Sequence, residues 1–191
     1  MRKSGAACAT AKLRPSVRNT ISTSGERLLE YVDDIEERLS GFARANNLQV
    51  IRQMGFGIHG RVFQVAAPRS TAVVKVFESD DGYQRERDVY LRLREAEVTE
   101  IEGCNVPGLL EFSNELRLLQ ISLVIRPFCL DFAAAYLDAL PSYFPPMGEE
   151  WEAEKREQFG EEDWPKVLRV LDELESYGIY QTDVTPTNIS V

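Results

Sequence analysis

The sequence predicts an α+β fold, with an antiparallel five-stranded sheet and one helix, preceded by an amphipathic helix and followed by the start of a helical part. Three observations predict it. A glycine-rich run at residues 55–60 joins two strand-like segments, and a third strand-like segment carries Lys75. A helical pattern follows at residues 82–95, and two more strand-like segments come after it.

Length and composition bound the class of protein. The chain has 191 residues and 43% hydrophobic composition, which suits one globular domain with extensions. The net charge of -9 argues against a nucleic-acid partner, because such binding needs a basic surface. No apolar stretch approaches the roughly 18 to 20 residues that cross a bilayer, so we expect no membrane partner. Cys8, Cys104 and Cys129 form no CxxC pair, which favours a reducing, cytoplasmic setting.

The chain divides into four predicted regions. Residues 1–24 contain five Lys and Arg and no acid, which indicates a flexible basic tail. Residues 25–45 have apolar side chains at alternating steps of four and three, which predicts an amphipathic helix lying across the domain that follows; a docking helix for a partner is the alternative. Residues 46–126 form the sheet-containing N-lobe. Residues 127–191 form a hinge and a partial C-lobe.

Each element is predicted from its local pattern. Asp80 and Asp81 are expected to cap the helix at 82–95. Further helices are expected at 131–140 and at 163–177, the latter stopped by Gly178. The acidic segment 149–163 is interpreted as a surface insertion, either a solvated spacer or a docking site. The five strands are predicted at residues 48–52, 61–66, 72–77, 108–112 and 116–125.

The glycine run is typical of a phosphate-binding turn. Gly55, Gly57 and Gly60 allow the backbone to bend over a triphosphate and to aim N–H groups at it. In a dinucleotide-binding fold a helix would follow the glycines, whereas here a strand follows. Val62, just after the run, would then pack on the adenine. His59 is expected to be a solvated side chain at the loop tip.

Lys75 lies in an apolar strand, where an unpaired ammonium would be costly. It therefore needs an anionic partner. Glu86, on the following helix, is the best candidate; the alternative is that Glu86 is a solvated helix residue.

Residues 55–62, Gly-Phe-Gly-Ile-His-Gly-Arg-Val, and the strand Ala-Val-Val-Lys ending at Lys75 resemble the glycine-rich loop and lysine strand of protein kinases and kinase-like phosphotransferases, in a compact bacterial-type or atypical form. Residues 180–189 resemble the kinase catalytic loop. The resemblance implies that Lys75 binds the α- and β-phosphates of ATP and that Glu86 holds Lys75. It also implies that Asp183 accepts or orients the proton of the acceptor hydroxyl and that Asn188 binds Mg²⁺.

The resemblance has departures. Gln181 and Thr182 stand where the kinase motif has His and Arg, and Thr185 stands where a Lys is frequent. The sequence ends three residues past Asn188, before an Asp-Phe-Gly segment. The leading hypothesis is transfer of the γ-phosphate of ATP to a hydroxyl of a protein or a small molecule. The alternative is a truncated pseudokinase that binds nucleotide or protein partners without catalysis; a third is a fragment without a stable fold.

Overall fold

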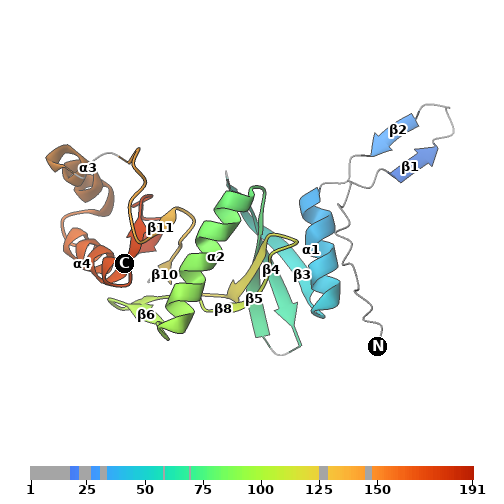
Figure 1. Ribbon diagram of the computed structural model, residues 1–191, viewed down its shortest axis with the longest axis horizontal. Coiled ribbons are helices and arrows are strands. Elements are labelled where there is room, and N and C mark those ends of the chain that lie inside the picture. Colours follow the sequence, from blue (N-terminus) through green and yellow to red (C-terminus); the bar gives the residue numbers. More distant parts are fainter. Residues whose placement is uncertain are drawn as a thin grey trace, which may run out of the picture.

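The computed structural model describes residues 18–21, 27–30, 34–57, 59–68, 70–124, 129–144 and 148–191. These residues form four helices and a set of mostly antiparallel strands, so the predicted α+β class is confirmed (Figure 1). Most of the predicted basic tail lies outside the described residues. Of the helices that the structure describes, none is long and apolar enough to cross a membrane.

The largest sheet has five antiparallel strands in the order β3-β4-β5-β9-β8. Every strand predicted for it is present. The first three are consecutive in the chain, so each pairs with the next across a short turn. β5 lies at the centre of the sheet and is buried over six consecutive residues. The bounds are β3 (Gln49–Gly57), β4 (Gly60–Ala67), β5 (Ser70–Phe77), β8 (Leu109–Ser113) and β9 (Leu118–Ser122).

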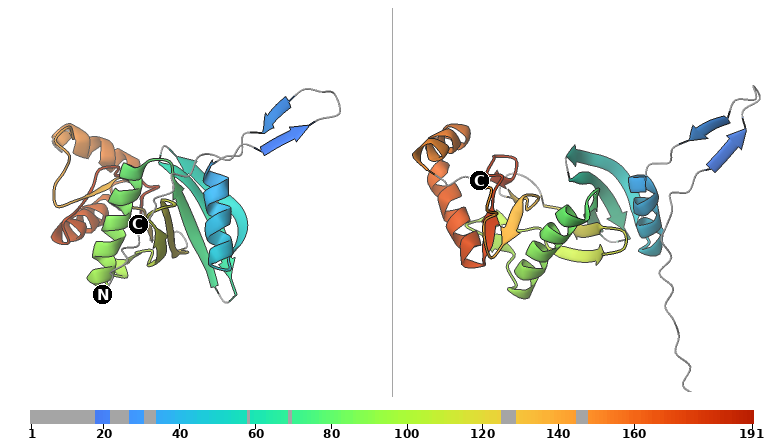
Figure 2. Two further views of the ribbon diagram at one scale, coloured as in Figure 1. Left: turned by 45° about the vertical axis from the view of Figure 1, so that its right-hand side comes forward. Right: turned by 45° about the horizontal axis from the view of Figure 1, so that its top comes forward.

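Two helices cover the two faces of this sheet, as Figures 1 and 2 show. α1 (Asp34–Ala45) packs on the face that presents Val74 and Val76. α2 (Asp80–Glu95) packs on the face that presents Val73 and Phe77. Successive side chains of a strand point to opposite faces, so β5 supplies both layers of the core. Lys75, which lies between Val74 and Val76, therefore faces α2.

Two helix starts differ from prediction. The helix predicted from residue 25 begins at Asp34, because residues Arg27–Glu30 form β2, which pairs with β1 (Arg18–Ile21). Strand pairing thus outweighs the local helical pattern there, and β1 falls within the segment predicted as a flexible tail.

The N-cap of α2 is Ser79 rather than Asp80 or Asp81. Its Oγ accepts a hydrogen bond from the Gly82 N–H at 3.2 Å, and the two acids occupy the first turn, where the helix dipole favours negative charge.

Two segments far apart in the sequence lie side by side in the C-terminal part. β10 (Cys129–Leu130) pairs with β13 (Ile189–Ser190), and β11 (Ala135–Leu137) pairs with β12 (Ile179–Gln181). β10 also extends a small sheet through β7 (Cys104–Asn105) and β6 (Glu100–Ile101). The helix predicted at 131–140 is therefore wrong. Pairing between strands that are distant in sequence satisfies the backbone groups that a helix would have used.

The last two helices lie against each other. α4 (Trp164–Ser176) confirms the predicted helix, and Gly178 follows its end with a φ of +71°, a conformation that favours glycine. α3 (Glu149–Phe159) occupies the acidic segment and buries none of its residues fully. Its two aromatic side chains nevertheless contact Trp164, with ring centroids 6.0 and 6.1 Å apart. The acidic segment is thus an ordered surface helix.

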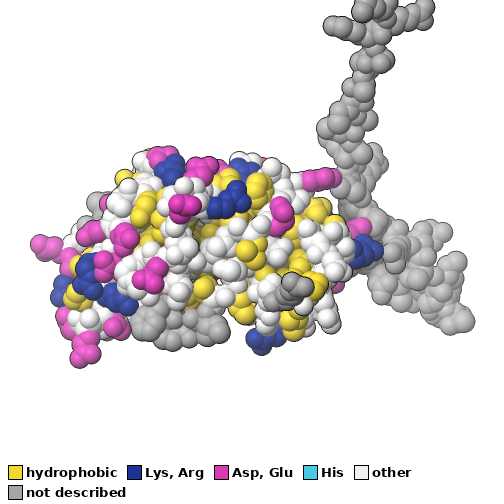
Figure 3. Space-filling view, turned by 90° about the horizontal axis from the view of Figure 1, so that it is seen from below, with side chains coloured by type: hydrophobic (Ala, Val, Ile, Leu, Met, Phe, Trp, Pro, Cys, Tyr) yellow, Lys and Arg dark blue, Asp and Glu magenta, His cyan; other side chains and the backbone are white. Residues whose placement is uncertain are grey.

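Acidic and basic side chains are mixed on the face seen in Figure 3. Lys and Arg lie there in small groups beside Asp and Glu, and they do not merge into one patch. This face therefore lacks the continuous positive surface that binding to the phosphate backbone of a nucleic acid requires.

Arg38 joins α1 to the sheet. Its Nη1 donates to the carbonyl oxygens of Phe77 and Leu116, both at 2.9 Å, although these residues lie far away in the sequence. We expect Arg38→Ala to lower the free energy of unfolding by about 3 kcal/mol, because it leaves buried carbonyls without a donor. Urea unfolding measures this loss. Arg44→Ala, on the exposed side of the same helix, is the control; equal losses in the two variants would contradict the prediction.

Candidate functional site

A cavity of about 690 Å³ lies between the five-stranded sheet and the C-terminal part. Its walls come from the β3–β4 hairpin, β5, α2, the segment after β10 and the loop between β12 and β13. It brings together seven of the residues singled out from the sequence. These are Gly55, Gly60, Val62, Lys75, Glu86, Asp183 and Asn188.

The glycine run forms the turn of the β3–β4 hairpin. Gly57 pairs with Gly60 across the turn, and Gly55 pairs with Val62, while residue 58 lies outside the described residues. Gly60 has a φ of +145°, and a Cβ there would lie 2.0 Å from the carbonyl oxygen of Val76. Only glycine fits this position. His59, expected to be solvated, is half-buried and lines the cavity.

Lys75 and Glu86 form the predicted ion pair. The Lys75 Nζ lies 2.5 Å from Glu86 Oε1, and the two residues are 7% and 1% exposed. Burial alone lowers the pKa of Lys75, but the carboxylates of Glu86 and Asp131 outweigh it and hold that pKa well above its usual value. Burial raises the pKa of the Glu86 carboxyl, while the ammonium opposes that rise. Lys75 is therefore expected to carry its positive charge at neutral pH.

A second carboxylate, which sequence reasoning missed, also contacts Lys75. Asp131 Oδ1 lies 2.9 Å from the Lys75 Nζ and lines the cavity. The local sequence carried a signal: Asp131 is the only charged residue between Arg126 and Asp138, within an otherwise apolar run. A lone acid in an apolar segment needs a partner, just as Lys75 does.

The loop between β12 and β13 presents Asp183 and Asn188. The Asn188 Nδ2 donates to Asp183 Oδ2 at 2.7 Å and to the Asp183 carbonyl oxygen at 3.0 Å, which fixes the two side chains together. The loop is held from behind, since the Thr182 Oγ1 donates to the carbonyl oxygen of Ala134 at 2.7 Å. Asp183 is exposed, so its carboxylate can contact a ligand that enters from solvent.

The charged side chains that line the cavity determine which ions and ligands it can bind. Two cations, Arg61 and Lys75, face three acids, Glu86, Asp131 and Asp183. In the described ranges, no group of three His, Cys, Asp or Glu side chains is arranged to hold a metal ion. Mg²⁺ characteristically uses one or two carboxylates and takes its other oxygens from water and substrate phosphates. The side-chain oxygen of Asn188 fits that chemistry when a polyphosphate is bound beside it, since the Nδ2 is the atom hydrogen-bonded to Asp183.

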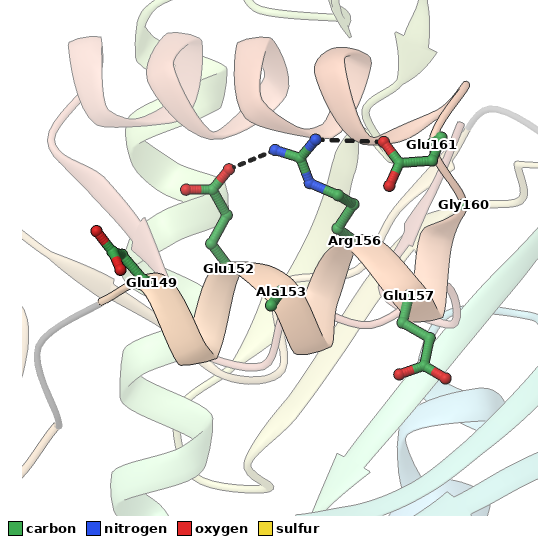
Figure 4. A pocket seen from close by; sticks show the side chains of 7 residues that line it. All are labelled: Glu149, Glu152, Ala153, Arg156, Glu157, Gly160 and Glu161. Carbon is green, nitrogen blue, oxygen red and sulfur yellow. Dashed lines mark hydrogen bonds and ion pairs between the residues drawn. The ribbon is translucent and has the colours of Figure 1, made fainter.

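A second hollow is lined by residues of α3 and of the turn that follows it (Figure 4). Arg156 lies between Glu152 and Glu161 and is paired with them at 2.7 Å and 3.2 Å, while Glu149 and Glu157 also line the hollow. The arginine is thus already neutralised, and the remaining surface is acidic and open. Ion pairs along the surface of a helix account for this arrangement.

No protein-family model matches the chain, and no curated protein matches it either. The site must therefore be interpreted from its own geometry.

Glu86 is expected to stabilise the fold through Lys75. Glu86→Ala leaves a buried ammonium with only the half-exposed Asp131, so we expect a loss of about 3 kcal/mol in the free energy of unfolding. Thermal and urea unfolding measure it. Glu95→Ala, an exposed glutamate on the same helix, is the control. If Glu86→Ala loses no more stability than the control does, the buried pair does not support the fold.

Proposed function

We propose that this protein is a kinase-like phosphotransferase that binds ATP with Mg²⁺ and transfers the γ-phosphate to a hydroxyl of a protein or small molecule. One observation carries the proposal. The buried Lys75–Glu86 pair opens on the same cavity as the glycine hairpin and the Asp183–Asn188 loop. Spacing in the sequence does not require these three features to meet.

The cavity suits a nucleotide in size and in chemistry. Its volume of about 690 Å³ lies within the range of ordinary ligand sites. Lys75 offers a fixed positive charge for the phosphates, and Gly55, where a Cβ would meet nothing within 4 Å, leaves that part of the lining without a side chain. Val62 supplies apolar surface on the same wall for the base. When bound, Mg²⁺ would neutralise phosphate charge, with the side-chain oxygen of Asn188 as its protein ligand.

Asp183 is the group suited to the proton transfer. The acceptor hydroxyl gives its proton to the Asp183 carboxylate as its oxygen bonds to the γ-phosphorus. The bond from the γ-phosphorus to the bridging oxygen breaks, and that oxygen leaves with ADP. Asn188 holds the carboxylate in place through its amide. Lys75, held by Glu86, keeps the phosphates in position, so catalysis would consist of positioning and electrostatic stabilisation.

A nucleotide-binding module without transfer is the alternative function. Both cations that line the cavity, Arg61 and Lys75, come from the sheet; in the part of the chain that the structure describes, the Asp183 loop contributes none. The protein would then still bind nucleotide, but no cation from the described residues would lie on the Asp183 side of the γ-phosphate to support its transfer.

For either function we propose a cytoplasmic location, supported by the sequence, in which the three cysteines form no CxxC pair.

Lys75 should be required for nucleotide binding. We expect Lys75→Met to weaken binding of ATP in excess MgCl₂ by about 10- to 100-fold, because a charge-assisted contact to phosphate is lost. Isothermal titration calorimetry measures the affinity, and circular dichroism checks that the variant is folded. Arg52→Ala removes an exposed cation from β3 and is the control. Failure of the native protein to bind ATP would refute the proposed function.

Asp183 should separate transfer from binding. We expect Asp183→Asn to bind ATP with MgCl₂ nearly as the native protein does and to form ADP about 10²- to 10⁴-fold more slowly, because a proton acceptor is lost. Release of ADP in the presence of hydroxyl-bearing proteins and small molecules measures the rate. Equal ADP formation by both proteins would favour the binding module over the transferase.

A further inference from the structure

The Lys75 ammonium is shared by two carboxylates of different kinds. Both line the cavity, but the Glu86 side chain is only 2% exposed, whereas the Asp131 side chain is 41% exposed. A ligand phosphate that binds Lys75 must approach its ammonium group from the solvent-exposed side of the cavity. Asp131 therefore stands where the phosphate has to bind.

Asp131 is held in place by the segment that carries the Asp183 loop. Its backbone N–H donates to the Asn188 carbonyl oxygen at 2.8 Å, and its carbonyl oxygen accepts from the Gln181 Nε2 at 2.9 Å. Its Oδ1 also accepts the Ala133 N–H at 3.0 Å. The first two contacts fix the Asp131 backbone and the third holds its carboxylate, so the carboxylate cannot swing away without breaking a hydrogen bond.

This fixed carboxylate opposes a bare polyphosphate. Two like charges held this close repel each other strongly at a site that is only partly open to water. A divalent cation between them reverses the effect, because carboxylate and phosphate oxygens are both ligands that Mg²⁺ prefers. Asp183 also lines the cavity, but it is bonded to Asn188 and has no contact with Lys75 among those described.

We propose that Asp131 is a specificity-determining residue that admits nucleotide as its Mg²⁺ complex and rejects metal-free nucleotide, by competing with the phosphates for Lys75. The inference rests on the proposed nucleotide site. It assigns Asp131 a function distinct from that of Glu86, which positions Lys75 from the buried side.

Asp131→Asn tests this directly, because the amide keeps an oxygen for Ala133 N–H and Lys75 but removes the charge. Calorimetry compares the affinities for ATP in excess MgCl₂ and for ATP in EDTA. We expect the native protein to prefer the Mg²⁺ complex by about 100-fold or more, and the variant to narrow that ratio at least tenfold, chiefly by binding metal-free ATP more tightly. Asp138→Asn, an exposed acid paired with Arg92 just beyond β11, is the control and should keep the native ratio.

The outcomes separate this inference from the proposed function. If native protein binds ATP with MgCl₂ and Asp131→Asn keeps the native ratio, Asp131 does not set specificity, although the nucleotide site stands. If Asp131→Asn weakens the binding of ATP in MgCl₂ and of ATP in EDTA equally, Asp131 is a positioning residue only, and this result would also overturn the inference. If the native protein binds neither ligand, both proposals fall. Asp131→Ser provides a second uncharged variant should the amide perturb folding, and it is held to the same ratio.

Discussion

The structure depends on placing one ammonium group inside the protein. Lys75 sits at the centre of β5, and leaving its charge unpaired there would cost several kcal/mol, a large share of the stability of a small domain. α2 must therefore dock so that Glu86 meets the Lys75 Nζ, at the 2.5 Å that the structure shows. That single requirement fixes the helix relative to the sheet, and the floor of the cavity follows from it.

The register of the sheet delivers Lys75 to that point. Val62 lies opposite Lys75 on one side and Leu119 on the other, and Gly60, at the hairpin turn, lies opposite Phe77, so the glycine hairpin is held close along the sheet to Lys75. A slip of one residue would turn Lys75 toward α1 and Val74 toward α2, exchanging the two faces of the core. The pairing that builds the hydrophobic core is thus the same pairing that aligns the cavity wall.

Local patterns were enough to predict the five strands, α2, α4 and the stop at Gly178, because each depends on residues within one element. The Lys75–Glu86 pair was also predictable, since burial of a lysine demands an acid nearby. Residues 131–140 were not, because their backbone partners lie some 50 positions away and leave no local trace. Asp131 did leave a local signal, a lone acid in an apolar run, but its partner Lys75 lies 56 residues away, so the signal did not identify the partner. The start of α1 shows that strand pairing can override an apolar periodicity that predicts a helix. The Ser79 cap shows that a hydroxyl side chain can cap a helix where the two acidic residues after it were expected to do so.

The two walls of the cavity differ in how far apart along the chain their contacts lie, and this has a consequence for folding. Lys75 and Glu86 are 11 residues apart, and the hairpins of the sheet are equally local. Lys75 and Asp131 are 56 residues apart, and Asp131 and Gln181 are 50 apart. Contacts of low sequence separation cost less loop-closure entropy and form sooner. The lysine side of the cavity can thus assemble while the Asp183 side is still unstructured, which makes the complete cavity a late product of folding.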